Sequence, residues 1–217
     1  MLRVQDVRVN IRKLAILRGV TLEVPHGAIV ALVGRNGAGK TTTLRAVMGL
    51  MPISAGAITV NGTDMHRVPP HQRASMGIGY MPEDRRLIPL LTVEQNLLLP
   101  AWANRLKAPG DSLERIYRLI PAVKTFAPRR AGQLSGGQQK LAALARSLMV
   151  GRRLLLLDEP FEGLAPALVE QLGMVLQALM GEGVAILIAE SELTHIGRLA
   201  QQYYTIERGE IISSDGQ

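Results

Sequence analysis

One segment of the sequence restricts the possible folds more than any other: Gly34-Arg-Asn-Gly-Ala-Gly-Lys-Thr41. It follows a continuous apolar run, Ala28–Val33, which is typical of a central strand buried on both faces. A stretch with a helical pattern follows, from about Lys40 to Gly49. A strand, a glycine-rich turn and a helix in this order let successive backbone N–H groups surround phosphate oxygens at the positive end of the helix. The segment therefore predicts an α/β fold with a phosphate-binding loop.

The side chains of this loop have predicted roles. Lys40 should contact the β- and γ-phosphates of a nucleoside triphosphate, and Thr41 should ligate Mg²⁺. A plain strand–helix turn would need one or two glycines but has no need of the Lys-Thr pair, so we favour the nucleotide site. The residues that we expect to bind the phosphates are Gly34, Arg35, Asn36, Gly37, Ala38, Gly39, Lys40, Thr41 and Thr42.

A second candidate is the pair of carboxylates that ends the apolar run Leu154–Leu157. Asp158, at the end of the predicted strand, can reach Mg²⁺ through a water molecule, and Glu159 can act as general base on the attacking water. An apolar run that ends in an acid is common. The pair is therefore a strong signal only together with the phosphate-binding loop.

A third candidate is the segment Ser135-Gly-Gly-Gln138. Ser135 and Gln138 form a capping-box pattern, which predicts the start of a helix over 138–149. The segment could be no more than this N-cap. However, Gly136 and Gly137 leave backbone N–H groups accessible, which is typical of an anion site at a helix N-terminus. We therefore count all four residues as candidates for nucleotide binding.

The remaining pattern places these motifs in one domain. Apolar alternation predicts strands in the first 24 residues, and Asn61-Gly62 predicts a hairpin turn. The Leu-rich, Pro-interrupted middle is helical in pattern, with Thr92 as a possible cap. Helices then alternate with strands, which implies a mainly parallel sheet. The helices are predicted over 138–149, 166–181 and 192–201, and the strands over 153–158, 184–189 and 203–207. We expect a single domain over 1–217, with a core formed by 1–84 and 135–217 and a helical subdomain over 85–134.

Composition limits the partners and the location. The chain has no cysteine, which excludes disulfides and thiolate metal sites. No apolar run approaches the roughly 18 residues that span a bilayer, and the N-terminus lacks the apolar stretch of a secretory signal. The net charge of +7 could indicate nucleic acid or anionic lipid, but the basic residues are dispersed and no aromatic side chains interleave with them. We therefore expect a cytoplasmic or peripheral protein that does not bind nucleic acid.

The three motifs, in this order and spacing, resemble the ATP-binding cassette (ABC) family over essentially the whole chain. The resemblance implies a P-loop NTPase core with a mainly parallel sheet, an N-terminal antiparallel β region and an inserted α-helical subdomain. It also implies ATP and Mg²⁺ as cofactors, and ATP hydrolysis coupled to transmembrane transport. A second ABC ATPase subunit is implied as well, in a head-to-tail dimer in which Ser135 to Gln138 of one subunit face the γ-phosphate held by the other.

Four further segments are similar to the smaller ATP-binding subunit of branched-chain amino acid (Liv-type) importers, a subfamily that includes urea and short-chain amide importers. They are Gly34–Arg45, Tyr80–Arg86, Leu91–Leu97 and Gly163–Glu170. This similarity implies two integral-membrane permease subunits, a periplasmic binding protein and a location on the inner face of the cell membrane. Two alternatives stay open: a regulatory subunit with weak hydrolysis, and a soluble ABC ATPase that acts on nucleic acid, for which the basic pI is the only support.

Some positions depart from the family pattern. Where the family usually has an aromatic residue that stacks on adenine, this chain has Ile11 or a neighbour within 10–13, which implies weaker adenine binding. Where a Gln usually meets Mg²⁺, the chain has Glu83, which is either a metal ligand or a surface residue. Ser191 takes the place of a His that contacts the γ-phosphate in many relatives, which implies slower hydrolysis. Phe161, in the loop after Glu159, is either an interface anchor or part of the core.

Overall fold

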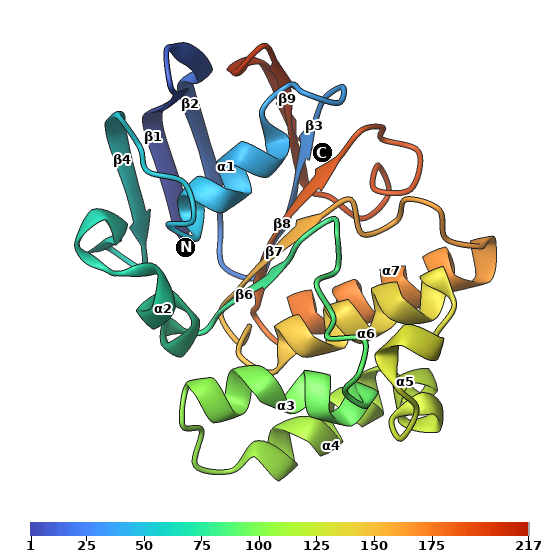
Figure 1. Cartoon of the computed structure of the whole chain (residues 1–217). Helices are drawn as coiled ribbons and strands as arrows, with labels where there is room; N and C mark the ends of the chain where they lie inside the picture. Colours follow the sequence, from blue (N-terminus) through green and yellow to red (C-terminus); the bar gives the residue numbers. More distant parts are fainter. Residues whose placement is uncertain (217) are drawn as a thin grey trace.

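Two sheets and a group of helices make up the structure, a computed structural model that describes residues 1–216 (Figure 1). The larger sheet has the strand order β10-β9-β3-β8-β7-β6, and all its strand pairs are parallel except β10 with β9. This confirms the predicted mainly parallel sheet. Its strands are β3 (Ile29–Val33), β6 (Ile78–Met81), β7 (Leu154–Asp158), β8 (Ala185–Glu190), β9 (Gln202–Glu207) and β10 (Glu210–Gly216).

The smaller sheet is antiparallel, with the order β2-β1-β4-β5. Its strands are β1 (Leu2–Ile11), β2 (Leu14–Val24), β4 (Ala55–Val60) and β5 (Thr63–Asp64). The turn between β4 and β5 is the one predicted at Asn61-Gly62, and both residues have positive φ, 49° and 76°. Asn and Gly adopt this conformation more easily than other residues, which is why the pair marks a two-residue hairpin.

The larger sheet separates two hydrophobic cores. Along β3, Ile29 and Ala31 pack against the helices on one face. Val30 and Leu32 pack on the other face, against α1 (Lys40–Val47) and the antiparallel sheet. Both faces of the strand are therefore buried, which explains its uninterrupted apolar sequence. Helices α6 (Gly136–Leu148) and α7 (Pro166–Gly181) cover the first face (Figure 1).

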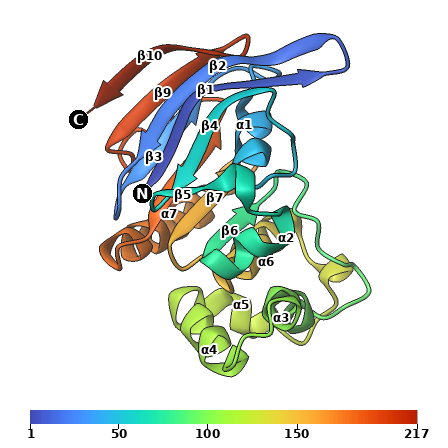
Figure 2. The same cartoon turned by 90° about the vertical axis from the view of Figure 1, so that its left-hand side faces the viewer.

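Three helices gather at the end of the molecule farthest from the antiparallel sheet (Figure 2). They are α3 (Val93–Ala103), α4 (Pro109–Leu119) and α5 (Pro121–Phe126). The predicted cap at Thr92 is present, as a capping box with Gln95. All three lie in the segment 85–134 that we propose as the helical subdomain. Short helical segments complete the fold: the α-helix α2 (Pro70–Arg73) and the 3₁₀-helices η1 (Met65–Arg67), η2 (Ala74–Met76) and η3 (Ala131–Gln133).

The predicted helix over 192–201 is wrong. The segment consists of turns, and Gly197 and Ala200 each donate one hydrogen bond to the residue four positions before. Ile196 and Ala200 are buried and lie four residues apart, so a single turn produces the spacing that indicated a helix. Strand β10 was not predicted because its exposed residues Ser213–Asp215 lack an apolar alternation. Among residues 1–216, no helix is both long and apolar enough to cross a membrane.

Candidate functional site

The loop between β3 and α1 opens into a cavity at the carboxyl ends of the parallel strands. The cavity measures about 510 Å³ and brings together residues from two of the three predicted motifs and two of the departing positions. Its lining consists of Ile11, Ile16, Asn36, Gly37, Gly39, Lys40, Thr41, Thr42, Glu83 and Glu159. Because carboxyl ends of parallel strands meet at one edge of a sheet, residues distant in sequence converge there.

The glycines of the loop are required by its geometry. Gly37 and Gly39 have φ of 82° and 117°, in the region that favours glycine. A Cβ on Gly34 would collide with the carbonyl oxygen of Ile206. Gly39 precedes α1 and offers no side chain to its first N–H groups, and the first turn of α1 has no acidic residue. These N–H groups therefore remain available for an anion.

Lys40 connects the loop to the neighbouring strand ends. Its side chain is buried, and its Nζ donates to the carbonyl oxygen of Gly34 at 2.5 Å and to Ser191 Oγ at 3.2 Å. The same Nζ forms an ion pair with Glu159 Oε1 at 3.0 Å. Lys40 and Glu159 both line the cavity, so the ammonium can turn from the carboxylate to a phosphate that enters there.

Two other predicted loop residues act through their backbone. The carbonyl of Arg35 accepts from the Ala38 N–H at 3.0 Å, and the Ala38 carbonyl accepts from the Gly209 N–H at 2.9 Å. Neither side chain is part of the cavity lining. Arg35 and Ala38 therefore shape the loop through their backbone.

Asp158 and Thr41 form a donor set that fits Mg²⁺. Thr41 Oγ1 donates to Asp158 Oδ1 at 3.1 Å, and Asp158 is fully buried. Burial raises the pKa of Asp158 to about 6; the Thr41 hydrogen bond opposes this rise and the charge of Glu83 adds to it. A divalent cation would compensate this buried charge. Residues 1–216 contain no cluster of three or more His, Asp or Glu side chains that could hold a metal ion.

Glu159 has the environment of a general base. Its carboxylate accepts from Ser191 Oγ at 2.7 Å and from the Ser191 N–H at 3.2 Å. Burial acts to raise the pKa of Glu159, but hydrogen bonds from Glu190, Ser191 and Lys40 outweigh it and lower the pKa. The carboxylate is therefore ionised at neutral pH, as proton abstraction requires. Its backbone is unusual, with φ of 49°, and its N–H donates to the Ala189 carbonyl.

Glu190 is the last residue of β8, and Ser191 follows it directly. The Ser191 hydroxyl lies within hydrogen-bond distance of Asn36 Oδ1, at 3.1 Å, as well as of Lys40 and Glu159. The structure thus brings Ser191 to the site, as predicted. Glu190 was not singled out from the sequence. Burial and its hydrogen bond with Glu159 raise the pKa of Glu190 to about 8, although the Phe161 N–H opposes the rise.

The positions that depart from the family pattern have different surroundings. Glu83 lines the cavity and lies close enough to Asp158 to raise its pKa, which favours the metal-side alternative over a remote surface residue. Ile11 also lines the cavity and is 44% exposed, so the wall it forms is aliphatic. Phe161 is 1% exposed and lies 6.1 Å from the His195 ring, which makes it part of the core.

The segment Ser135–Gln138 is not part of the cavity lining. It has the predicted capping box: Ser135 Oγ accepts from the Gln138 N–H at 3.3 Å, and Gln138 Oε1 accepts from the Ser135 N–H at 3.1 Å. Ser135 and Gly136 are exposed, and Gly137 is half-buried. Within one chain the segment therefore does not line the cavity at Lys40. The capping box uses the N–H groups of Ser135 and Gln138, which leaves those of Gly136 and Gly137 for another molecule.

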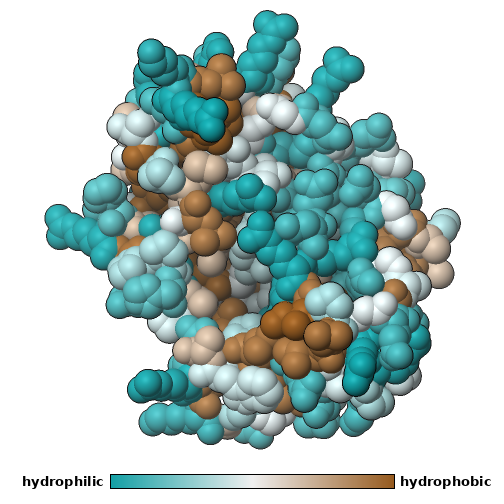
Figure 3. All heavy atoms as spheres, in the orientation of Figure 1, coloured by the Kyte–Doolittle hydropathy of each residue, from teal (hydrophilic) through white to brown (hydrophobic). Residues whose placement is uncertain are grey.

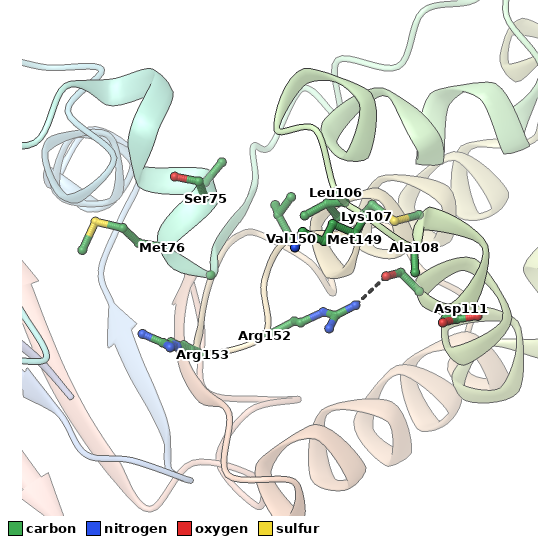
Figure 4. A pocket seen from close by; sticks show the side chains of 13 residues that line it. Ser75, Met76, Leu106, Lys107, Ala108, Asp111, Met149, Val150, Arg152 and Arg153 are labelled. Carbon is green, nitrogen blue, oxygen red and sulfur yellow. Dashed lines mark hydrogen bonds between the residues drawn. The ribbon is translucent and has the colours of Figure 1, made fainter.

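A second cavity, of about 490 Å³, lies at the amino ends of β6 and β7 (Figure 4). Residues of η2, of the loop between α3 and α4, and of the loop before β7 surround it. Arg152 crosses it to donate a hydrogen bond to Ser112 Oγ. None of the residues predicted from the motifs lines this cavity.

Comparison with known proteins gives consistent matches. The family model described as "ABC transporter" matches residues 17–162. The protein named high-affinity branched-chain amino acid transport ATP-binding protein BraG, from Pseudomonas aeruginosa, is 34% identical over 99% of this chain and 92% of its own length. The lipopolysaccharide export system ATP-binding protein LptB from Haemophilus influenzae is 32% identical over 99% of this chain and 90% of its own. A solved structure described as the ATP-binding subunit of an ABC transporter matches with a TM-score of 0.88 and 28% identity, covering all of this chain and 90% of that one.

Proposed function

The chain belongs to the ABC transporter family, and we propose that it is the ATP-hydrolysing subunit of an importer for branched-chain amino acids or related small amides. The observation that carries the proposal is the convergence of Lys40, Glu159 and Ser191 at the mouth of the phosphate-binding loop. The family membership confirms the resemblance inferred from the sequence, and with it the expected fold and ATPase class.

The proposed mechanism begins with the ion pair between Lys40 and Glu159. When the phosphates of ATP enter the cavity, Lys40 turns to them from the carboxylate, and the N–H groups of the loop and of α1 bind the phosphate oxygens. Glu159 is then free to accept a proton from the attacking water. Thr41 and Asp158 would hold Mg²⁺, which would supply positive charge to the phosphates.

The complete site needs a second subunit. The exposed Ser135 segment presents N–H groups that its own cavity does not use. In the proposed dimer these groups face the γ-phosphate of ATP held by a second copy or a related subunit. The helical subdomain, 85–134, would then follow α6 when the two subunits close, and this movement would be transmitted to the permeases.

Two features of the helical side favour a membrane-protein partner. The cavity of Figure 4 lies between the core and the proposed subdomain, and a segment of a permease could occupy it. Ile88 and Leu90, in the segment between β6 and α3, are 43% and 78% exposed. Figure 3 shows hydrophobic side chains gathered in the lower half of this face. We therefore propose that the chain binds two permease subunits at the inner face of the cell membrane.

Export is the second candidate. The similarity to proteins named LptB, which belong to a lipopolysaccharide export system, is only slightly lower than that to BraG. The permeases choose the substrate, so the ATPase chain carries little information about it. An assay of phosphate release separates import from export. The tagged chain is purified with its membrane subunits and placed in lipid vesicles for this assay. Stimulation by leucine in the presence of a binding protein supports import, and stimulation by lipopolysaccharide alone contradicts it.

The ATPase assignment itself has a direct assay. Phosphate release by the purified chain with magnesium-ATP should fall by at least about 100-fold in Glu159→Gln, because the amide cannot accept the proton. The same variant should still bind ATP. Leu90→Glu serves as a matched control: it should release the chain from its membrane subunits and leave phosphate release by the isolated chain unchanged. A rate unaffected by Glu159→Gln would remove Glu159 from its assigned role.

A further inference from the structure

A buried lysine on α6 contacts the backbone of the loop that carries Glu159. The Nζ of Lys140 donates to the carbonyl oxygen of Glu159 at 2.7 Å and also to the carbonyl oxygen of Glu162. The residue is 4% exposed. Lys140 therefore bridges the first and last residues of the segment 159–162 from a separate element of the fold.

The free-energy cost of burying an ammonium group makes this contact informative. A charged amine loses its hydration on burial and is tolerated only when hydrogen bonds and opposite charges replace the water. Burial lowers the pKa of Lys140, and the carboxylates of Glu162, Glu190 and Glu159 act against this effect. The two carbonyl contacts and the Glu162 carboxylate, 3.8 Å from Nζ, thus replace the water and hold the side chain in place.

The contact helps to hold Glu159 in a backbone conformation that a residue with a Cβ rarely adopts. Glu159 has φ of 49°, a region sparsely populated by residues with a Cβ. In this conformation its N–H donates to the Ala189 carbonyl, its carbonyl accepts from Lys140, and its carboxylate lies against Lys40 and Ser191. A change in the direction of the Glu159 carbonyl would therefore also change the direction of its carboxylate.

We propose that Lys140 is a positioning residue for ATP hydrolysis, which fixes the backbone of Glu159 so that its carboxylate points into the phosphate cavity. The inference rests on the proposed role of Glu159 as general base. Lys140 lies on the helix that begins at the exposed Ser135 segment. In the proposed dimer, the start of α6 contacts the ATP that the other subunit holds. Lys140 would thereby couple the position of Glu159 in one ATP site to the helix that contacts ATP in the other site.

The first test compares three substitutions at Lys140 with one control. Lys140→Met removes the ammonium and keeps the hydrocarbon chain, Lys140→Gln keeps one donor, and Lys140→Arg keeps the charge. Lys124→Met makes the same chemical change at a side chain that is 61% exposed. For Lys140→Met we expect kcat to fall by about 10- to 100-fold, with ATP affinity and KM within about twofold, because only the position of the base changes. Lys140→Arg should retain more activity, and Lys124→Met should match the unmodified chain.

The second test asks whether Lys140 acts through Glu159. In the Glu159→Gln background, adding Lys140→Met should cause no further loss of the residual rate, because residues that act as a unit are not additive. Full additivity would overturn the proposal. So would a kcat within twofold of the unmodified chain for Lys140→Met with unchanged melting temperature.

Hydrogen exchange separates this inference from the proposed function. The amides of Glu159 and of 161–163 should exchange faster in Lys140→Met and Lys140→Gln than in Lys124→Met, whether or not the chain hydrolyses ATP. Faster exchange without any Glu159-dependent ATPase activity in the unmodified chain would reject the function and leave the backbone contact intact. Unchanged exchange would reject the positioning role itself.

Discussion

Lys40 and Glu159 form a buried ion pair, with Nζ 3.0 Å from Oε1. In the proposed reaction Lys40 must instead contact a phosphate, and Glu159 must accept a proton from water. The pair satisfies two charges that would otherwise be buried alone. It also means that nucleotide binding exchanges one partner of Lys40 for another. Binding and the release of the base are therefore linked through a single side chain.

Replacement of Lys40 should weaken nucleotide binding. Lys40→Ala removes a charge-assisted contact to the phosphates, so we expect the affinity for magnesium-ATP to fall by about 10- to 100-fold. Calorimetric titration of the purified chain measures this. Lys124→Ala, at an exposed side chain on α5, is the control. An affinity unchanged by Lys40→Ala would contradict the assignment of the loop as the phosphate site.

Loss of the Ser191 hydroxyl should change the pH dependence of hydrolysis. Hydrogen bonds from Ser191 help to lower the pKa of Glu159, so Ser191→Ala should raise that pKa. The acid limb of the kcat profile would then move to higher pH. Steady-state rates between pH 5 and pH 9 measure the shift. An acid limb at the same pH would show that Ser191 has no influence on the base.

The stability of the nucleotide-free chain should depend on pH through Glu190. Burial and the hydrogen bond with Glu159 raise the pKa of Glu190 from 4.5 to about 8. The folded state therefore binds the extra proton, and this contribution to stability is present at low pH and lost as pH rises through about 8.

Glu190→Gln keeps a donor for Glu159 and cannot ionise. The free energy of unfolding of the variant minus that of the unmodified chain should be larger at pH 9 than at pH 6, by at least about 1 kcal/mol. Urea unfolding at the two pH values measures the difference. Parallel pH dependence in both proteins would place the titration elsewhere.

An aromatic residue at position 11 should strengthen adenine binding. Ile11 lines the cavity with an aliphatic side chain, and stacking of a base on an aromatic ring contributes about 1–3 kcal/mol. We expect Ile11→Tyr to raise ATP affinity by about tenfold. Leu14→Tyr is the control, because Leu14 is exposed on the same hairpin and does not line the cavity. Equal affinities of the two variants for ATP would mean that adenine does not lie against position 11.

Local patterns predicted the parts of the site that depend on backbone form. The loop at Lys40, the cap at Ser135 and the acids that end β7 each follow from a few neighbouring residues, so their elements appear where the sequence placed them. Whether these residues bind ATP stays a prediction. The turns over 194–199 were mistaken for part of a helix, since one buried turn and a longer helix share the same apolar spacing.

The residues that the sequence did not reveal act across long separations. Lys140 contacts a carbonyl 19 positions away, and Glu190 contacts the Phe161 N–H 29 positions away. Nothing in the neighbouring residues distinguishes Glu190 from another acid at the end of a strand, and only one feature distinguishes Lys140 from a solvated lysine. A charged residue directly before the apolar stretch Leu141–Ala145 was the one available signal for Lys140.

The open position of the Ser135 segment has a genetic consequence. In the proposed dimer, damage at Ser135 and damage at Lys40 fall on different ATP molecules, even though both lie on one chain. If the partner is a different protein, each defect affects one of the two ATP sites and leaves the other site, which the partner completes, intact. If instead the chain pairs with itself, we expect an allele inactive at Ser135 and an allele inactive at Lys40 to complement each other, because their mixed dimer keeps one intact ATP site.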